Sequence, residues 1–251
     1  SILSRFRPND FQVVRERLPE IRADLSPVPL FRSGAWQRGA ASWTQLREKS
    51  LPGRGPEKET NRFDAHYTLT YPMRLARGVR LTPRAGTRLT HYADNSQGQP
   101  DYTRWLGEFG LDLDAVAHSV REVRNRVWNI DGLRHEVRPR LSYRWVPDAD
   151  QGTGRFTPID VPVFSFNRFP VDLNDERRID APGKRHFVRI GLDNVLQTRD
   201  ADGGSRSLAR FSIHQDVVID KNPGEETLDA LWVEVTANPA PFLELSLFSR
   251  S

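Results

Sequence analysis

Polar and apolar residues alternate along four stretches of the chain. In residues 61–72, aromatic and aliphatic side chains occupy every second position, and the positions between them are polar or charged. A period of two is that of a β-strand with one apolar and one polar face. The same alternation recurs in residues 79–90, 105–119 and 133–146. We therefore predict a strand in each of these stretches.

Weaker alternation predicts further strands on both sides of these four. They are residues 13–25, 35–46, 186–197, 207–219, 229–237 and 241–249. The total is about ten strands, and several exceed the five or six residues of a usual globular strand. Lengths of about ten residues or more suit a tilted strand that crosses a bilayer. No window shows a helical period of 3.6 residues, so we expect little helix.

The predicted connections alternate between short and long. Along the chain they are residues 26–34 (short), 47–59 (long), 73–78 (short), 93–103 (long), 122–132 (medium) and 147–185 (very long). Alternate connections of an antiparallel sheet lie at the same end, and short periplasmic turns with long extracellular loops are typical of outer-membrane barrels. Within the longest connection, residues 161–166 are expected to form a short extra strand or a lid. The pattern favours an all-β, antiparallel up-and-down transmembrane β-barrel.

Composition agrees with this interpretation once the strand pattern is considered. The mean hydropathy of −0.62 is that of a soluble protein, but a barrel strand turns only every second side chain to lipid, so its mean hydropathy is ordinary. The net charge is +4, and the basic residues are spread along the chain instead of forming a patch. We therefore expect a membrane environment and no nucleic-acid partner.

Aromatic residues near the predicted strand ends are consistent with girdles at the two membrane interfaces. They are Tyr71, Tyr92, Trp105, Trp128, Tyr143 and Trp145.

No residue pattern indicates catalysis or a metal centre. The chain has no cysteine, and its six histidines are scattered, without the spacing of metal ligands. Carboxylate pairs such as Asp112 and Asp114 occur, but any polar-lined barrel contains such pairs. We predict a protein that is not an enzyme and that has no metal or other cofactor.

The stretch 133–146 has the most informative polar face. Its charged residues are Arg134, Glu136, Arg138, Arg140 and Arg144. We expect these side chains to face the lumen, because a charge on the lipid side costs about 2–4 kcal/mol near the midplane. Two interpretations stay open: pairing with acids of neighbouring strands, or contact with an anionic sugar-phosphate or a plug protein.

The same stretch carries a family resemblance. Residues 133–143 read LRHEVRPRLSY and residues 146–151 read VPDADQ, which resembles a strand and the following loop of the LptD family of lipopolysaccharide-assembly proteins. The residues that match this motif are His135, Pro139, Tyr143, Pro147, Asp150 and Gln151.

Further short motifs follow in family order and extend the resemblance over nearly the whole chain. They are RLPEI at 17–21, RFD at 62–64, LTP at 81–83, ERRIDA at 176–181 and LWVEV at 231–235. This similarity implies translocation of lipopolysaccharide to the outer leaflet of the outer membrane of a Gram-negative bacterium. It also implies three partners: lipopolysaccharide, an LptE-like lipoprotein that plugs the lumen, and a periplasmic Lpt bridge reached through a β-jellyroll.

The chain departs from the family pattern in two respects. No jellyroll precedes the first predicted strand, and the cysteines of many members are missing. We therefore expect residues 1–251 to be a single barrel region, a central segment of a larger barrel, although about ten strands that close on themselves remain an alternative. The alternative functions are a passive outer-membrane porin and a soluble glycan-binding β-domain.

Overall fold

A computed structural model describes most of the chain. The described residues are 1–6, 15–49, 57–96, 98, 100–149, 158–160, 170–176, 179–180, 182–200, 202–221, 226–240 and 242–251. The strands are β1 (Ile2–Arg5), β2 (Arg15–Pro29), β3 (Trp36–Glu48), β4 (Lys58–Thr70), β5 (Met73–Ala76), β6 (Val79–Ala93), β7 (Tyr102–Ala115), β8 (Ala117–Asn125), β9 (Ile130–Val146), β10 (Arg185–Arg199), β11 (Ser205–Val218), β12 (Leu228–Ala240) and β13 (Leu243–Arg250).

Helix is nearly absent from the part of the chain that the structure describes. Its one helix is a short 3₁₀ turn, η2 (Leu173–Asp175), and no helix there is long and apolar enough to cross a membrane. This confirms the prediction of low helix content.

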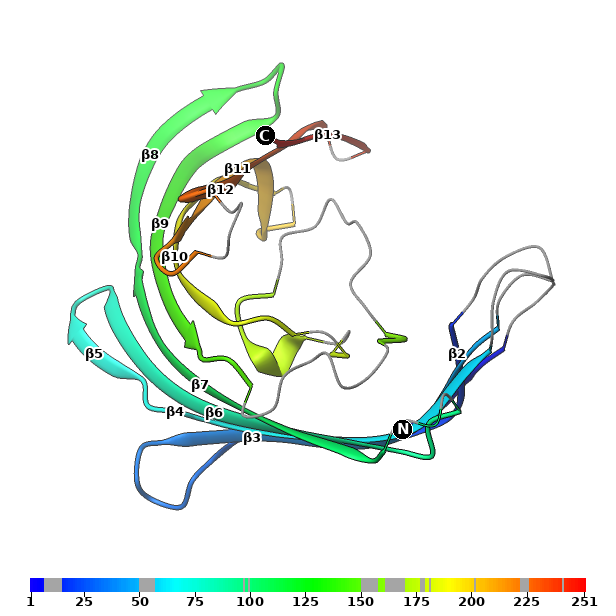
Figure 1. Cartoon of the computed structure of the whole chain (residues 1–251). Coiled ribbons are helices and arrows are strands. Elements are labelled where there is room, and N and C mark those ends of the chain that lie inside the picture. The colour runs from blue at the N-terminus through cyan, green and yellow to red at the C-terminus, as the bar shows by residue number, and fades with distance from the viewer. Residues whose placement is uncertain are drawn as a thin grey trace. The chain divides into compact units, whose positions relative to one another are not determined.

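The strands form one antiparallel sheet in which chain neighbours are sheet neighbours (Figure 1). The order is β1-β2-β3-β4-β6-β7-β9-β10-β11-β12-β13, with β5 paired to β6 and β8 paired to β9. Every stretch predicted as a strand coincides over most of its described length with strands of this sheet. The up-and-down all-β architecture is therefore confirmed, and the order is a linear path with β1 and β13 at its ends.

Proline explains why β4 and β5 are separate strands. On β6, Arg84 pairs with Thr70 of β4, and Leu81 pairs with Met73 of β5. Pro83 lies between these two pairs and has no backbone N–H to donate, so the ladder is interrupted there.

The strand predicted over residues 105–119 is wrong in one respect, because it is divided. β7 ends before Val116, whose backbone N–H donates to the carbonyl of Gly78 at 2.8 Å instead of to a neighbouring strand of the ladder. The chain then continues as β8 as far as Asn125, so residues 122–132 are not the medium connection that was predicted. The turn between β8 and β9 is confined to residues 126–129.

The pairing of β8 with β9 stops close to a second proline. Its last pair at this end joins Ala117 to Val137, and Pro139 follows on β9. Proline cannot donate a hydrogen bond to the ladder, so a change of the strand that pairs with β9 is expected near this position.

The structure divides into two compact units. The first contains residues 1–71, 84–109 and 145–185, and the second contains residues 72–83, 110–144 and 186–251. Each is described separately below.

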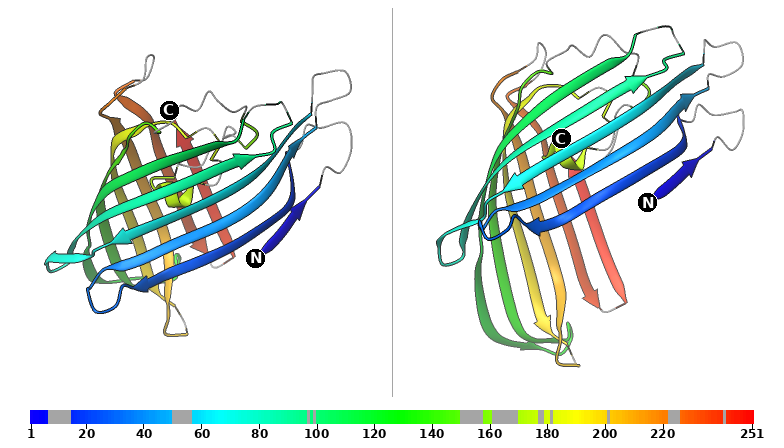
Figure 2. Two further views of the ribbon diagram at one scale, coloured as in Figure 1. Left: turned by 60° about the horizontal axis from the view of Figure 1, so that its bottom comes forward. Right: turned by 90° about the horizontal axis from the view of Figure 1, so that it is seen from below.

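The predicted sorting of connections by length is preserved. Residues 30–35, 77–78, 126–129, 200–204 and 241–242 form the short set, and residues 49–57, 94–101, 147–184 and 219–227 form the long set. Figure 2 shows the strands of each unit lying side by side, joined at alternate ends. Residues 161–166, where an extra strand or lid was expected, lie outside the described residues.

The two faces of the sheet in the first unit reverse the usual order of burial. On β4 the buried side chains are polar, such as Asp64 and Thr68, whereas Phe63 on the other face is 41% exposed. On β7, Arg104 is buried and Trp105 is 51% exposed. A soluble protein rarely exposes a continuous apolar surface of this kind. The apolar face therefore requires an apolar environment.

The second unit has the same division. On β10 Arg189 is buried and Ile190 is 52% exposed, and on β11 His214 is buried while Phe211 is exposed. The sheet thus has one polar face and one apolar face in each unit, as the alternation in the sequence predicts. We call them the polar face and the apolar face.

Candidate functional site: the polar face

In the first unit, the longest connection covers the polar face of β4, β6 and β7. The described parts of this connection are residues 147–149, 158–160, 170–176, 179–180 and 182–184. Figure 1 shows η2 lying against one side of these strands. We call this covering segment the strap.

One carboxylate, that of Asp180, holds the strap to two strands. Its Oδ1 accepts hydrogen bonds from Arg62 Nη1 on β4 at 2.7 Å and from the Tyr92 hydroxyl on β6 at 2.9 Å. Its Oδ2 accepts from the backbone N–H groups of Ile159 at 3.0 Å and Asp160 at 2.6 Å. The Arg62 and Asp180 side chains are 4% and 0% exposed. Both charges are therefore desolvated, and each depends on the other.

Neighbouring groups extend this cluster. Asp160 Oδ2 accepts from Arg17 Nη2 on β2 at 2.9 Å and also from Arg62. Arg104 on β7 donates to the backbone carbonyls of Asp180, at 3.1 Å, and of Ile179. Four strands thus contribute a side chain to one buried polar cluster, Arg17–Arg62–Tyr92–Arg104–Asp160–Asp180.

A second buried cluster lies beneath η2. Arg88 on β6 forms a two-point ion pair with Asp64 on β4, with Nε–Oδ1 and Nη2–Oδ2 distances of 2.8 and 2.9 Å. The remaining guanidinium nitrogen, Nη1, donates to the backbone carbonyls of Leu173 and Glu176 in the strap. Charge-assisted bonds of this kind are stronger than neutral ones. Because Arg88 also holds strap carbonyls, its ion pair on the sheet positions the strap.

Apolar contacts complete the strap. Leu173 packs with Leu106 and Val146, and Ile159 packs with Leu46, Tyr92 and Tyr102. Leu173 and Ile159 are 4% and 1% exposed. The strap is therefore held by polar and apolar contacts together.

Tyr92 does not belong to an interfacial girdle, contrary to the expectation from its position near a strand end. It is 2% exposed and points to the polar face, where Asp180 accepts its hydroxyl hydrogen bond. The physical reason is strand parity, because Tyr92 shares its face with Arg88 and Thr90, both buried. The exposed positions of Tyr71, Trp105, Trp128 and Trp145 remain compatible with a girdle.

In the second unit the charged residues predicted on β9 share the polar face and form ion pairs. Glu136 accepts from Arg134 Nη2 at 2.8 Å and from Arg138 Nε at 2.5 Å. Arg140 Nε lies 3.5 Å from both Asp114 on β7 and Asp193 on β10. Arg140 therefore pairs with acids of neighbouring strands, as one of the two interpretations expects, whereas Arg134 and Arg138 pair with an acid of their own strand.

Arg144, the fifth residue, also pairs across strands. Its Nη2 donates to both carboxylate oxygens of Asp112 on β7, at 2.8 and 2.9 Å. That this whole face lines a lumen stays a prediction.

Exposure separates three arginines of β9 from the two that lie under the strap. The side chains of Arg134, Arg138 and Arg140 are 47%, 45% and 48% exposed. Arg62 and Arg88 under the strap are each 4% exposed. The guanidinium groups of Arg134, Arg138 and Arg140 are thus accessible to a ligand, whereas those beneath the strap are committed to internal partners. Arg144 of β9 is 2% exposed and is likewise committed, to Asp112.

The motif residues of β9 are distributed over the apolar face. His135 Nε2 lies 3.3 Å from Asn194 Oδ1 on β10, and the Tyr143 hydroxyl lies 3.1 Å from His186 Nε2. Pro139 is exposed and Pro147 is half-buried.

The other two motif residues, Asp150 and Gln151, lie outside the described residues. The motif residues that the structure does describe are not gathered into one site.

Sequence reasoning missed the anchors of the strap. Residues 176–181 were selected only as a motif, and no role was assigned to Asp180, while Arg88 and Arg104 were not selected at all. Their signal was present as basic residues on the polar side of alternating strands. Within the described residues, no group of three or more His, Asp or Glu side chains is placed to hold a metal ion.

Comparison with known families supports the resemblance noted in the sequence. The model of the family described as "LptD: LPS transport system D" matches residues 16–168, more than half of the chain. The match extends from β2 through β9 and into the strap connection. No curated protein matches the chain. This family acts in lipopolysaccharide transport at the outer membrane and is not a known family of enzymes. Because its model matches more than half of the chain, the chain belongs to the LptD family.

Proposed function

We propose that this chain forms part of the wall of an outer-membrane barrel that translocates lipopolysaccharide to the outer leaflet. The observation that carries the proposal is the reversed burial of the sheet, with paired charges on one face and exposed aromatic and aliphatic side chains on the other. In this arrangement the apolar face meets lipid and the polar face lines the lumen. Residues 1–251 then act as one barrel region.

The polar face of β9 is the part of the wall best suited to meet lipopolysaccharide. Arg134 and Arg138 share the single carboxylate of Glu136, which leaves that group of three with one surplus positive charge. Both guanidinium groups are half-exposed. Guanidinium groups recognise phosphate through paired hydrogen bonds, and lipopolysaccharide carries phosphates on its sugars.

The partners in this proposal follow from the family. An LptE-like lipoprotein would occupy the lumen, and a periplasmic Lpt bridge would deliver lipopolysaccharide through a β-jellyroll. The strap supports a translocation barrel over a passive porin, because it covers the polar face of the first unit with buried ion pairs. The exposed apolar face is unfavourable for a soluble glycan-binding domain.

Site-specific photo-crosslinking in cells tests the proposal. A photoreactive amino acid is placed at Arg138 on the polar face or at Ile190 on the apolar face, in the full-length protein that carries this chain. We expect lipopolysaccharide adducts at position 138 and membrane-lipid adducts at position 190. Adducts of lipopolysaccharide at neither position, in a protein correctly inserted in the outer membrane, would contradict the translocation role.

A further inference from the structure

A polar patch interrupts the apolar face of the second unit. It consists of Ser119 and Arg121 on β8, His135 on β9 and Asn194 on β10. Ser119 is paired with His135, and Arg121 is paired with Leu133, so these side chains lie on one face. His135 joins the patch to Asn194 through a 3.3 Å contact between Nε2 and Oδ1.

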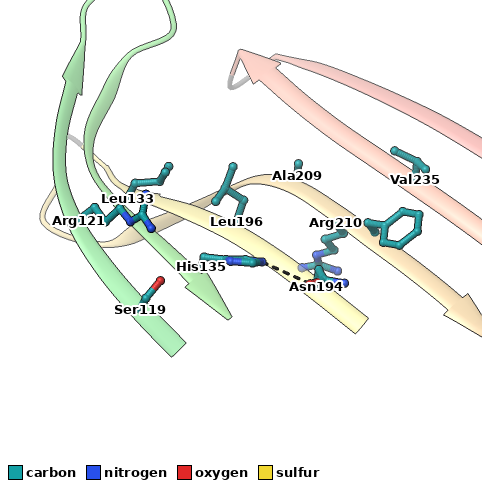
Figure 3. A pocket seen from close by; sticks show the side chains of 10 residues that line it. Ser119, Arg121, Leu133, His135, Asn194, Leu196, Ala209, Arg210 and Val235 are labelled. Carbon is teal, nitrogen blue, oxygen red and sulfur yellow. Dashed lines mark hydrogen bonds between the residues drawn. The ribbon is translucent and has the colours of Figure 1, made fainter. Parts of the chain in front are cut away.

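The patch is one side of a pocket. The pocket has a volume of about 360 Å³, and its apolar lining comes from Leu133, Leu196, Phe211 and Val235. Figure 3 shows side chains of neighbouring strands around it, with a dashed line for the contact between His135 and Asn194. Its size is within the usual range for sites that hold small molecules. The pocket therefore has a polar side and an apolar side.

The charge in this pocket is not balanced by a carboxylate. None of the residues that line it is acidic. Arg121 is exposed, and no described acid forms an ion pair with it. Arg210 also lines the pocket, but it alternates with Phe211 and is paired with Val195, so its side chain belongs to the polar face. Arg121 is therefore the cation of the pocket.

This differs from the polar face, where the arginines of β9 each have an acidic partner. An unbalanced guanidinium on a lipid-facing surface is costly near the bilayer midplane and inexpensive at the interface. Arg121 precedes the short turn of residues 126–129, and short turns are typical of the periplasmic end of a barrel. Position and charge thus both favour an anionic group at the periplasmic interface.

We infer that this pocket binds one phospholipid of the periplasmic leaflet. The phosphate is held by the Arg121 guanidinium and the Ser119 hydroxyl, beside the His135–Asn194 pair. An acyl chain lies along Leu196 and Phe211 on the apolar face. A guanidinium suits a phosphate ester because its N–H groups match two phosphate oxygens. The inference rests on the membrane placement in the proposed function.

A lipid-binding experiment on the full-length protein that carries this chain tests the inference. The protein is purified in detergent, depleted of lipid, and titrated with short-chain phosphatidylglycerol, with bound lipid counted by native mass spectrometry. We expect Arg121→Gln to weaken binding about tenfold, because one charge-assisted contact is lost. Leu196→Trp fills the pocket and should also reduce binding.

Arg74→Gln is the matched control. Arg74 is an exposed arginine on β5 in the same unit and does not line the pocket, so its replacement makes the same change of charge. Equal affinities for Arg121→Gln, Arg74→Gln and the unaltered protein would overturn the inference. So would preferential binding of lipopolysaccharide, or competition by inorganic phosphate alone at equal concentration.

A photoreactive group at Ile190 separates this inference from the proposed function. Ile190 is exposed on the apolar face and does not line the pocket. Lipid adducts at Ile190, together with equal phosphatidylglycerol affinities of Arg121→Gln and the unaltered protein, would contradict the phospholipid site alone. Absence of lipid adducts at Ile190 would contradict the membrane placement itself.

Discussion

The polar faces of the two units are built from the same residue types but are used differently. Beneath the strap, Arg62 and Arg88 are both buried. Arg62 pairs with Asp180 of the strap, and Arg88 pairs with Asp64 of the sheet and also donates to a backbone carbonyl of the strap. On β9, Arg134 and Arg138 are half-exposed and share Glu136. The comparison shows that an alternating polar strand face does not by itself define a role. The burial of each charged side chain decides whether it holds structure or remains available to a ligand.

The energetic difference follows from desolvation. Removing one partner of a buried ion pair costs about 3–5 kcal/mol, because the other charge remains buried without compensation. An exposed pair contributes about 0–1 kcal/mol. The clusters beneath the strap should therefore respond strongly to the loss of one carboxylate, and the Arg134–Glu136–Arg138 group of the second unit weakly.

The largest effect is expected for Asp180→Ala. The substitution removes the acceptor of Arg62, of the Tyr92 hydroxyl and of two backbone N–H groups, and leaves Arg62 with Asp160 at 3.3 Å. We expect the free energy of unfolding to fall by about 3–5 kcal/mol, measured from the urea midpoint of heat-modifiable migration on gels. Asp160→Ala should cost less, because Arg62 keeps its shorter contact to Asp180. Equal losses for the two variants would show that Asp180 is not the anchor of the strap.

The next largest effect is expected for Leu173→Ala. Leu173 is buried against Leu106 and Val146 beneath the strap, and replacing a buried leucine by alanine usually costs 2–5 kcal/mol. We expect about 3 kcal/mol in the same urea titration. Leu245→Ala is the control, because Leu245 is 57% exposed on β13. A loss for Leu245→Ala as large as that for Leu173→Ala would mean that the strap contributes no special stability.

The strands were predictable from the sequence because strand parity is a local property. Phe63 and Arg62 reveal their opposite faces by being neighbours. The interruption at Pro83 was also visible, since proline removes a ladder donor wherever it lies. The break at Val116 was less visible, because the proline near it, Pro139, is on another strand.

The anchors of the strap were not predictable, because their partners are remote in sequence. Asp180 and Arg62 are separated by 118 positions, and no period or spacing links them. The same holds for Asn194, which meets His135 across 59 positions. The charged face of β9 was found because its five members alternate along one strand, whereas the pocket around Arg121 combines residues of five strands.

A smaller effect is expected for Glu136→Gln. Glu136 is buried, but the two arginines that it binds are half-exposed, so water compensates much of the lost attraction. We expect a loss of about 1 kcal/mol in the free energy of unfolding. The same substitution should raise photo-crosslinking of lipopolysaccharide at position 138, because the Arg134 guanidinium loses its internal partner. A stability loss as large as that of Asp180→Ala would remove the distinction between the two polar faces.

The smallest effect is expected for Arg124→Gln, which breaks the pair between Arg124 Nε and Asp131 Oδ1 at 3.1 Å on the β8–β9 hairpin. The two side chains are 81% and 54% exposed, so the pair is solvated on both sides. We expect a change of less than about 0.5 kcal/mol, inside the error of the urea titration, at low salt as well as at high salt. The clusters beneath the strap and the Arg134–Glu136–Arg138 group differ in burial and not in residue type. The pair of Arg124 and Asp131 has the chemistry of Arg88 and Asp64 without their burial. If its loss costs as much as that of a strap carboxylate, burial is not what makes the charges of the first unit structural.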